Sequence, residues 1–151
     1  MKKICALILV FVLISSFQSV YARDDITVTI NGYIVVFDVP PQIINGRTMV
    51  PMRRIFESLG ANVNWVEEKS LVVATYKTSI ITMPIGETSF SVTDVLTNET
   101  RVVEIDVAPM IIDGRTLVPA RAVSEAIGKT VNWNGDTRTV IITDEAENKN
   151  D

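Results

Sequence analysis

Residues 41–75, PQIINGRTMVPMRRIFESLGANVNWVEEKSLVVAT, return as residues 109–143, PMIIDGRTLVPARAVSEAIGKTVNWNGDTRTVIIT, at a constant offset of 68 positions with no gap. We call these stretches the first and the second segment. Sixteen of the 35 paired positions are identical. The identical pairs include Gly46/Gly114, Arg47/Arg115, Thr48/Thr116, Pro51/Pro119, Arg53/Arg121, Glu57/Glu125, Gly60/Gly128 and Trp65/Trp133. A feature present in both copies of a repeat is more often architectural than a unique active site.

The repeated unit extends upstream of the first proline. Val35/Val103, Asp38/Asp106 and Val39/Val107 also pair at the same offset. We therefore predict an internal duplication with repeat units at about residues 26–76 and 94–143.

Hairpin turns are marked by dipeptides that favour positive φ. Residues 26–37 alternate β-forming side chains around Asn31-Gly32, and the same signal recurs at residues 45–46 and, as Asp-Gly, at residues 113–114. Such dipeptides between β-forming runs predict two-residue hairpins.

One short helix follows in each segment, at residues 51–59 and 119–127. Proline suits the first helical turn, and the apolar side chains fall at i, i+3, i+4 and i+7. Glycine at positions 60 and 128 predicts a left-handed C-cap. The predicted buried faces are Met52, Ile55, Phe56 and Leu59, and Ala120, Val123, Ser124 and Ile127.

After each helix the apolar period changes from 3.6 to 2, which predicts a strand, a turn and a second strand. Further strands are predicted between the segments, at residues 80–83, 89–92 and 101–105. The fold class is therefore α+β, with antiparallel sheet of short strands and hairpins packed on two short helices. We expect one compact unit, because no Gly/Ser-rich or Pro-rich linker separates the segments.

The ends of the chain predict export. A basic start, an apolar stretch at residues 4–14 and a small-residue site ending at Ala22 form the pattern of a secretory signal peptide at residues 1–22. A membrane anchor is disfavoured, because spanning a bilayer takes roughly 20 apolar residues. Cleavage would remove Cys5, the one cysteine of the chain. Residues 144–151, DEAENKND, are predicted to form a disordered acidic tail.

Composition restricts the partners. The 151 residues carry 14 Lys and Arg against 18 Asp and Glu, a net charge of −4. An acidic chain without clustered cations is not expected to bind nucleic acid. Nor do we expect a membrane partner after cleavage, and the oligomeric state stays open.

The repeated Gly-Arg-Thr-x-Val-Pro-x-Arg block has two interpretations. Four arginines, at positions 47, 53, 115 and 121, could form a fork-shaped receptor for an anion or carboxylate. Alternatively, Arg53 pairs with Glu57, and Arg121 with Glu125, as i, i+4 neighbours on a helix. The other two arginines would then bond turn carbonyls or carboxylates. We favour the structural interpretation because both segments carry the same set.

Trp65 and Trp133 also allow two interpretations. Exposed tryptophans stack on sugar rings, but the alternating apolar pattern favours core packing for both. If Trp65 lies in the core, its substitution by alanine should cost about 3 to 5 kcal/mol.

Missing residue types exclude several catalytic systems. The chain has no histidine, so Ser-His-Asp and Cys-His nucleophile systems and the usual zinc, copper and haem ligand sets are ruled out. A hydrolase with two carboxylates is the remaining enzymatic alternative. Glu67 and Glu68 have no acidic counterparts in the second segment beyond Asp136, and their predicted turn favours solvated side chains. We predict no catalytic, cofactor-binding or metal-binding residues.

The phrases INGRTMVPMRRIFESLGANVNW (residues 44–65) and IDGRTLVPARAVSEAIGKTVNW (residues 112–133) resemble the copper amine oxidase N-terminal-like domain, also called the stalk domain. The resemblance covers about residues 26–143. It implies an accessory α+β module that holds neither the copper nor the quinone cofactor of the oxidase. The oxidase's three histidine ligands and cofactor tyrosine motif have no counterpart, so the resemblance implies no amine oxidase activity.

Similar domains in exported bacterial proteins occur alone, repeated or attached to wall-acting enzymes. We therefore expect a non-catalytic stalk or interaction module, secreted or in the bacterial cell envelope, whose partner is a cell-wall glycan or another exported protein. The alternative is a carbohydrate or peptidoglycan binder that uses exposed aromatic side chains such as Tyr33, Tyr76 or Trp133.

Overall fold

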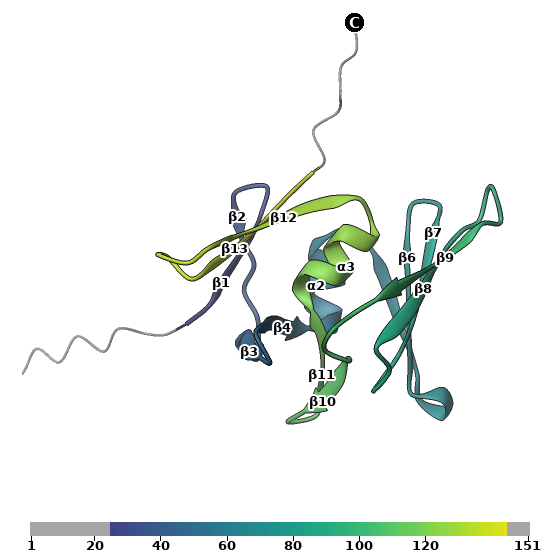
Figure 1. The fold of residues 1–151 in the computed structure, drawn as a ribbon, viewed down its shortest axis with the longest axis horizontal. Coiled ribbons are helices and arrows are strands. Elements are labelled where there is room, and N and C mark those ends of the chain that lie inside the picture. The colour runs from purple at the N-terminus through teal and green to yellow at the C-terminus, as the bar shows by residue number, and fades with distance from the viewer. Residues whose placement is uncertain (1–24, 145–151) are drawn as a thin grey trace, which may run out of the picture.

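Residues 25–144 are described by a computed structural model, shown in Figure 1. The predicted signal peptide at residues 1–22 lies outside the described residues, and so does the predicted tail beyond Asp144. Asp144 itself corrects the predicted tail boundary, because it is the last residue of a strand. Its backbone N–H donates to Asn31 Oδ1 at 3.0 Å, which holds it in place.

The two segments form the same strands and α-helix in the same order, and the first has an additional 3-10 helix. The first comprises β3 (Gln42–Ile44), β4 (Arg47–Pro51), α2 (Met52–Ser58), β5 (Asn62–Val66), the 3-10 helix η1 (Glu67–Lys69) and β6 (Leu71–Tyr76). The second comprises β10 (Met110–Ile112), β11 (Arg115–Pro119), α3 (Ala120–Ala126), β12 (Lys129–Asn134) and β13 (Thr139–Asp144). The other strands are β1 (Thr27–Ile30), β2 (Tyr33–Ile34), β7 (Ser79–Pro84), β8 (Ser89–Asp94) and β9 (Thr100–Glu104).

The predicted hairpin turns are confirmed. Asn45 and Gly46 have φ of 48° and 74°, and Asp113 and Gly114 have φ of 49° and 71°. Two consecutive residues with positive φ define the turn that matches the twist of a hairpin. The turn at residues 31–32, between β1 and β2, has the same form.

Both helices are two residues shorter than predicted. Pro51 and Pro119 remain in extended geometry, because each pairs across β4 and β11 before the chain turns into the helix. The predicted C-cap is confirmed at Gly60, with φ of 86°. Its N–H donates to Glu57 O at 3.0 Å, and the N–H of Ala61 donates to Phe56 O at 2.9 Å. These two bonds make a Schellman motif.

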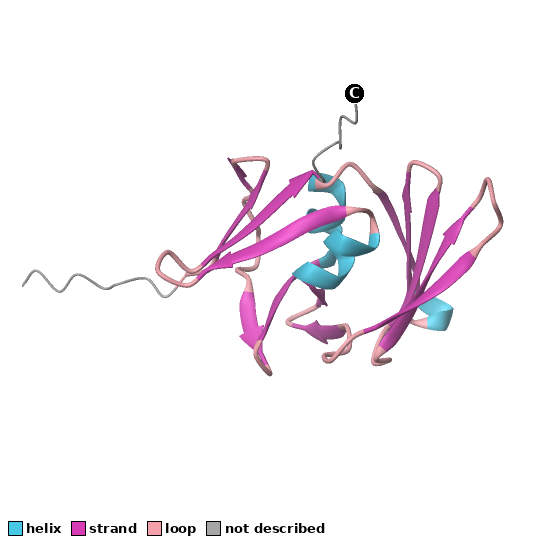
Figure 2. Cartoon of the chain, turned by 45° about the horizontal axis from the view of Figure 1, so that its top comes forward, coloured by secondary structure: helices cyan, strands magenta, loops and turns pink. Residues whose placement is uncertain are grey.

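Three sheets surround the helices. Sheet A has the order β12-β13-β1-β2, sheet B the order β10-β11-β4-β3 and sheet C the order β5-β6-β7-β8-β9. Figure 2 shows the two helices between sheets A and C, with sheet B along one end. The α+β class with mostly antiparallel sheet is thus confirmed.

One pairing departs from the predicted antiparallel arrangement. β1 runs parallel to β13, with Val28 opposite Val140 and Ile30 opposite Ile142. Parallel neighbours need a long crossover between them, and here the crossover is the chain from residue 31 to residue 138. The pairing buries Val28 and Ile142 in the core.

At the centre of sheet B the two segments meet. In the antiparallel β4–β11 pair, Val50 lies opposite Val118, its own counterpart at the 68-residue offset. Positions on either side therefore pair reciprocally, so Pro51 faces Leu117 while Pro119 faces Met49. Helix α2 contacts β11 as well as β5, and α3 contacts β4 as well as β12. Each helix thus packs on a strand of the other segment.

Both segments share one main core. Val50, Ile55 and Phe56 of the first segment and Val118 and Val123 of the second belong to the same buried cluster. Ser124, which interrupts the apolar face of the second helix, is fully buried. Its Oγ donates to Ala120 O at 2.8 Å, so its polar atom is satisfied inside the core.

Candidate ligand-binding grooves

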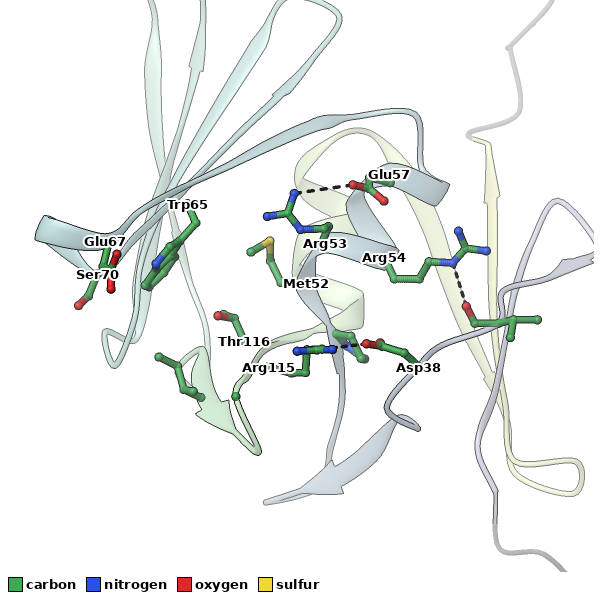
Figure 3. Close-up of a pocket in the computed structure, with 14 residues that line it drawn as sticks. Asp38, Met52, Arg53, Arg54, Glu57, Trp65, Glu67, Ser70, Arg115 and Thr116 are labelled. Atoms are coloured by element: carbon green, nitrogen blue, oxygen red, sulfur yellow. Dashed lines mark hydrogen bonds and ion pairs between the residues drawn. The ribbon is translucent and has the colours of Figure 1, made fainter.

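Two grooves flank the place where the segments meet. The first groove has a volume of about 920 Å³ and lies between α2, sheet C and the β10–β11 turn. In Figure 3, Trp65 stands at one side, with Arg53 and Arg115 extending from the other elements around it. The principal lining residues are Asp38, Met52, Arg53, Glu57, Trp65, Ile111, Arg115 and Thr116.

The second groove is built from the counterpart positions. It has a volume of about 420 Å³ and adjoins a hollow of about 530 Å³ that shares Arg47, Pro119 and Arg121 with it. Eight lining positions of the first groove recur in the second at the 68-residue offset. They are Ile43/Ile111, Gly46/Gly114, Arg47/Arg115, Thr48/Thr116, Pro51/Pro119, Met52/Ala120, Arg53/Arg121 and Trp65/Trp133.

Each groove takes residues from both segments. The Gly-Arg-Thr turn of the second segment lines the first groove, beside the helix start and tryptophan of the first segment. The reverse holds in the second groove. This exchange follows from the antiparallel β4–β11 pair, which is centred on Val50 and Val118. Each strand extends beyond that centre, so the turn before it lies beside the helix of the other segment. A single segment alone therefore contains no complete groove.

Two of the repeated arginines pair with carboxylates of the other repeat unit. Arg115 Nε lies 2.8 Å from Asp38 Oδ2, and Arg47 pairs reciprocally with Asp106. Asp38 and Asp106 are themselves counterparts at the 68-residue offset. All four side chains are about half exposed or more.

The other two repeated arginines pair within their helices. Arg53 Nη1 lies 4.0 Å from Glu57 Oε1, and Arg121 Nη1 lies 3.4 Å from Glu125 Oε1. Both pairs have i, i+4 spacing and are solvent-exposed. Screening by water makes such pairs weak contributors to stability.

The tryptophans occupy edge positions. Trp65 lies opposite Val72, and Trp133 opposite Val140, so both are on the core-facing side of their sheets, as the alternation predicts. However, β5 and β12 are edge strands. Trp65 is therefore only partly buried, and the expected core position of Trp133 is wrong, because 42% of this residue is exposed.

Asp38 in the first groove is not suited to act as a general acid. The hydrogen bond from Arg115 is the main cause of the lowered pKa of Asp38. A general acid requires the opposite shift, a raised pKa. Arg54 Nε donates to Val36 O at 2.8 Å, which fixes a third guanidinium at the rim.

The other aromatic candidates differ from each other. Tyr33, on edge strand β2, is 79% exposed. Tyr76 is partly buried, and the ammonium groups of Lys77 and Lys129 lie 5.3 and 5.2 Å from its ring centroid. Because cations cover this ring, Tyr76 is a poor stacking platform.

Two pairs of groove residues were absent from the predicted site. Asp38 and Asp106 pair with the turn arginines, and Ile43 and Ile111 are exposed at the edges of sheet B. Both pairs are visible as repeated positions in the sequence, but only the structure brings them to the grooves. Gly60 and Gly128 end the helices and do not line either groove.

Metal and membrane features were sought in the described residues. Among residues 25–144 there is no cluster of three or more His, Cys, Asp or Glu side chains arranged to hold a metal ion. Within the same part of the chain, neither helix is long and apolar enough to cross a bilayer.

Comparison with known proteins gives the family. A search of curated proteins found no match to the chain. The family profile described as "Copper amine oxidase N-terminal domain" matches residues 29–143, which covers nearly all of the described fold. This family is a non-catalytic domain of the oxidases, and no catalytic domain is evident beside it. The chain belongs to the copper amine oxidase N-terminal domain family.

Proposed function

We propose that the chain is an exported, non-catalytic interaction module of the bacterial cell envelope or the extracellular space. The observation that carries this proposal is the pair of matched grooves, in which the four repeated arginines are paired with carboxylates. Such pairs offer hydrogen bonds to a ligand. The signal-peptide pattern at residues 1–22 supports export.

We also propose that the two segments arose by duplication of one unit. The sequence identity at a constant offset supports this origin, and so does the recurrence of the same elements at that offset. A duplicated unit with two grooves fits a binding module better than an enzyme, since an enzyme needs only one catalytic centre.

The location is tested first. The full chain is expressed in a bacterial host with a C-terminal epitope, and the cell, envelope and medium fractions are probed. Export predicts a mature N-terminus at Arg23 in the envelope or the medium. A protein retained in the cytoplasm with Met1 intact would contradict the proposed localisation.

The interaction is tested separately. The purified chain from residue 23 is used to capture material from isolated cell walls and from secreted proteins. A matched control carries Val50→Asn and Val118→Asn together, which bury two unsatisfied amides at the centre of the core and unfold the chain while leaving its charge unchanged. Retention of a wall component or an exported protein by the folded chain alone is expected, and no retention would contradict the proposal.

Carbohydrate binding is a second candidate function. The observation that favours it is the 42% exposure of Trp133, in a groove that also contains Arg47 and Arg121. A partly exposed indole beside polar side chains is suited to a sugar ring.

A further inference from the structure

The two grooves present the same chemistry twice. An indole stands at the edge of a sheet, a guanidinium from the other segment's turn lies near it, and an isoleucine side chain completes the lining. In the first groove these residues are Trp65, Arg115 and Ile111, and in the second they are Trp133, Arg47 and Ile43.

The charges of the first groove are balanced. Arg53, Arg54 and Arg115 face Asp38, Glu57 and Glu67 along its lining. A free anion would have to compete with carboxylates already bonded to the arginines, and a cation would meet the guanidinium groups. The groove is therefore matched to a ligand that carries no net charge but many hydrogen-bonding groups.

The second groove is charge-balanced only together with its adjoining hollow, because Arg47 and Arg121 line the groove while their partners Asp106 and Glu125 line the hollow. Arg47, Arg101 and Arg121 face Glu104, Asp106 and Glu125 there. Arg101 Nη2 also donates to Ala126 O at 2.6 Å. Two ion pairs are repeated in both places, while Arg54 and Glu67 of the first groove have no charged counterparts and Arg101 and Glu104 complete the balance in the hollow.

Sugar rings combine these requirements. Their hydroxyl groups donate to carboxylates and accept from guanidinium groups, and the C–H face of the ring packs on an indole. We propose that the grooves are two matched binding sites for a neutral glycan, each centred on one tryptophan and completed by the Gly-Arg-Thr turn of the other segment. This inference rests on the proposed role as a binding module.

The shared core gives the two sites a fixed relation to each other. Because Val50 and Val118 pair at the centre of the molecule, neither groove moves independently of the other. A long neutral polymer that reaches both grooves would bind twice to one protein. The second binding event would then be intramolecular, which typically raises the apparent affinity 10²-fold or more.

The number of sites is tested by titration calorimetry with two short neutral oligosaccharides, chitohexaose and cellohexaose. At least one is expected to bind the chain from residue 23 at two ligands per protein. Trp65→Ala and Trp133→Ala should each reduce this to one, and the double variant should bind none. Tyr33→Ala is the matched control, an exposed aromatic residue that lines neither groove, and should retain two.

A polymer tests the linkage. For soluble glycol chitin or hydroxyethyl cellulose, the apparent affinity should fall about 10²-fold when either tryptophan is replaced. Far-UV circular dichroism of every variant checks that the fold is retained.

Several outcomes would overturn the inference. These are no binding of either neutral oligosaccharide, stronger binding of polygalacturonate than of the neutral ligands, or binding that the tryptophan variants leave unchanged. Capture of an envelope protein without glycan binding would leave the proposed function standing while removing this inference. Glycan binding by a chain that is not exported would contradict the proposed localisation while leaving this inference standing.

Discussion

At the scale of single residues, position in the sheet decides how much an apolar side chain contributes. Phe56 projects from α2 into the shared core and is fully buried, whereas Trp133 belongs to the alternating apolar pattern of β12 but stands on an edge strand. Burial of apolar area is the main stabilising term in folding. The smaller aromatic side chain should therefore contribute more to stability than the larger one.

This difference is measurable. Phe56→Ala is expected to lower the free energy of unfolding by about 3 to 5 kcal/mol, because it leaves a cavity in the core. Trp133→Ala should cost less, about 1 to 2 kcal/mol, because 42% of this residue is already exposed and its substitution removes less buried apolar area. Urea denaturation followed by circular dichroism gives both values. Equal losses for the two variants would contradict the edge position of Trp133.

Asp94 gives the fold a defined response to acid. Its Oδ1 accepts from the N–H groups of Leu96 and Thr97 at 2.8 and 3.2 Å, and its Oδ2 accepts from Thr78 Oγ1 at 2.9 Å. These hydrogen bonds lower the pKa of Asp94 below its ordinary value, and the bond from the Leu96 N–H has the largest effect. The carboxylate thus anchors the turn between β8 and β9.

The sign of the pH effect follows from this shift. A carboxyl group with a lower pKa in the folded state stabilises the fold above the unfolded-state pKa of about 3.9 and loses that contribution as the pH falls through the folded-state value. Asp94→Asn keeps an acceptor oxygen but removes the titration. The urea midpoint should therefore fall further between pH 7 and pH 3 for the natural chain than for the variant. A parallel fall in both would show that Asp94 does not contribute to acid sensitivity.

At the scale of elements, the end of α2 depends on one backbone conformation. Gly60 has φ of 86°, a region that costs other L-residues roughly 1 to 2 kcal/mol. An added Cβ would meet only Tyr76 Cε2 at 3.8 Å, which is an ordinary contact. Any cost of a side chain here is thus conformational rather than steric.

Gly60→Ala should consequently lower the free energy of unfolding by about 1 to 2 kcal/mol. Gly135→Ala is the control, since Gly135 lies outside the left-handed region and an added Cβ would meet Trp133 Nε1 at 3.6 Å. Thermal unfolding compares the two variants with the natural chain. A variant at position 60 as stable as the natural chain would argue against the Schellman motif.

At the scale of the whole molecule, the two segments depend on each other. The β4–β11 pair joins them through fully buried Val50 and Val118, and β1 closes sheet A against the last strand of the second segment. Each helix also packs on a strand of the other segment. Unfolding of either segment would expose the core of both.

We expect one cooperative transition for this reason. The chain has two tryptophans, one in each segment. In the Trp133→Phe variant the fluorescence comes from Trp65 and reports on the first segment, and in the Trp65→Phe variant it comes from Trp133 and reports on the second. Within each variant, urea midpoints from fluorescence and from circular dichroism should coincide. Peptides covering residues 26–76 and 94–143 should not fold alone. Different fluorescence and circular dichroism midpoints, or a folded half, would indicate two independent lobes.

The sequence by itself determined the local structure. Asn-Gly and Asp-Gly turns, the positions of the two helices, the glycine at the end of α2 and the core-facing side of Trp65 and Trp133 all depend on residues close to one another in the chain. Such features follow from backbone preference and periodicity, which a sequence displays directly. The repeat strengthened each of these predictions, because the same signals occur in both segments.

Only the tertiary structure decided which residues meet across long stretches of chain. The parallel β1–β13 pair, the exchange of Arg47 and Arg115 between segments and the edge positions of the tryptophans depend on strand order. Periodicity tells which side of a strand is apolar, but it does not tell whether a neighbouring strand covers that side. Strand order is set by the packing of both segments on one core, and for that physical reason the grooves exist only in the folded molecule.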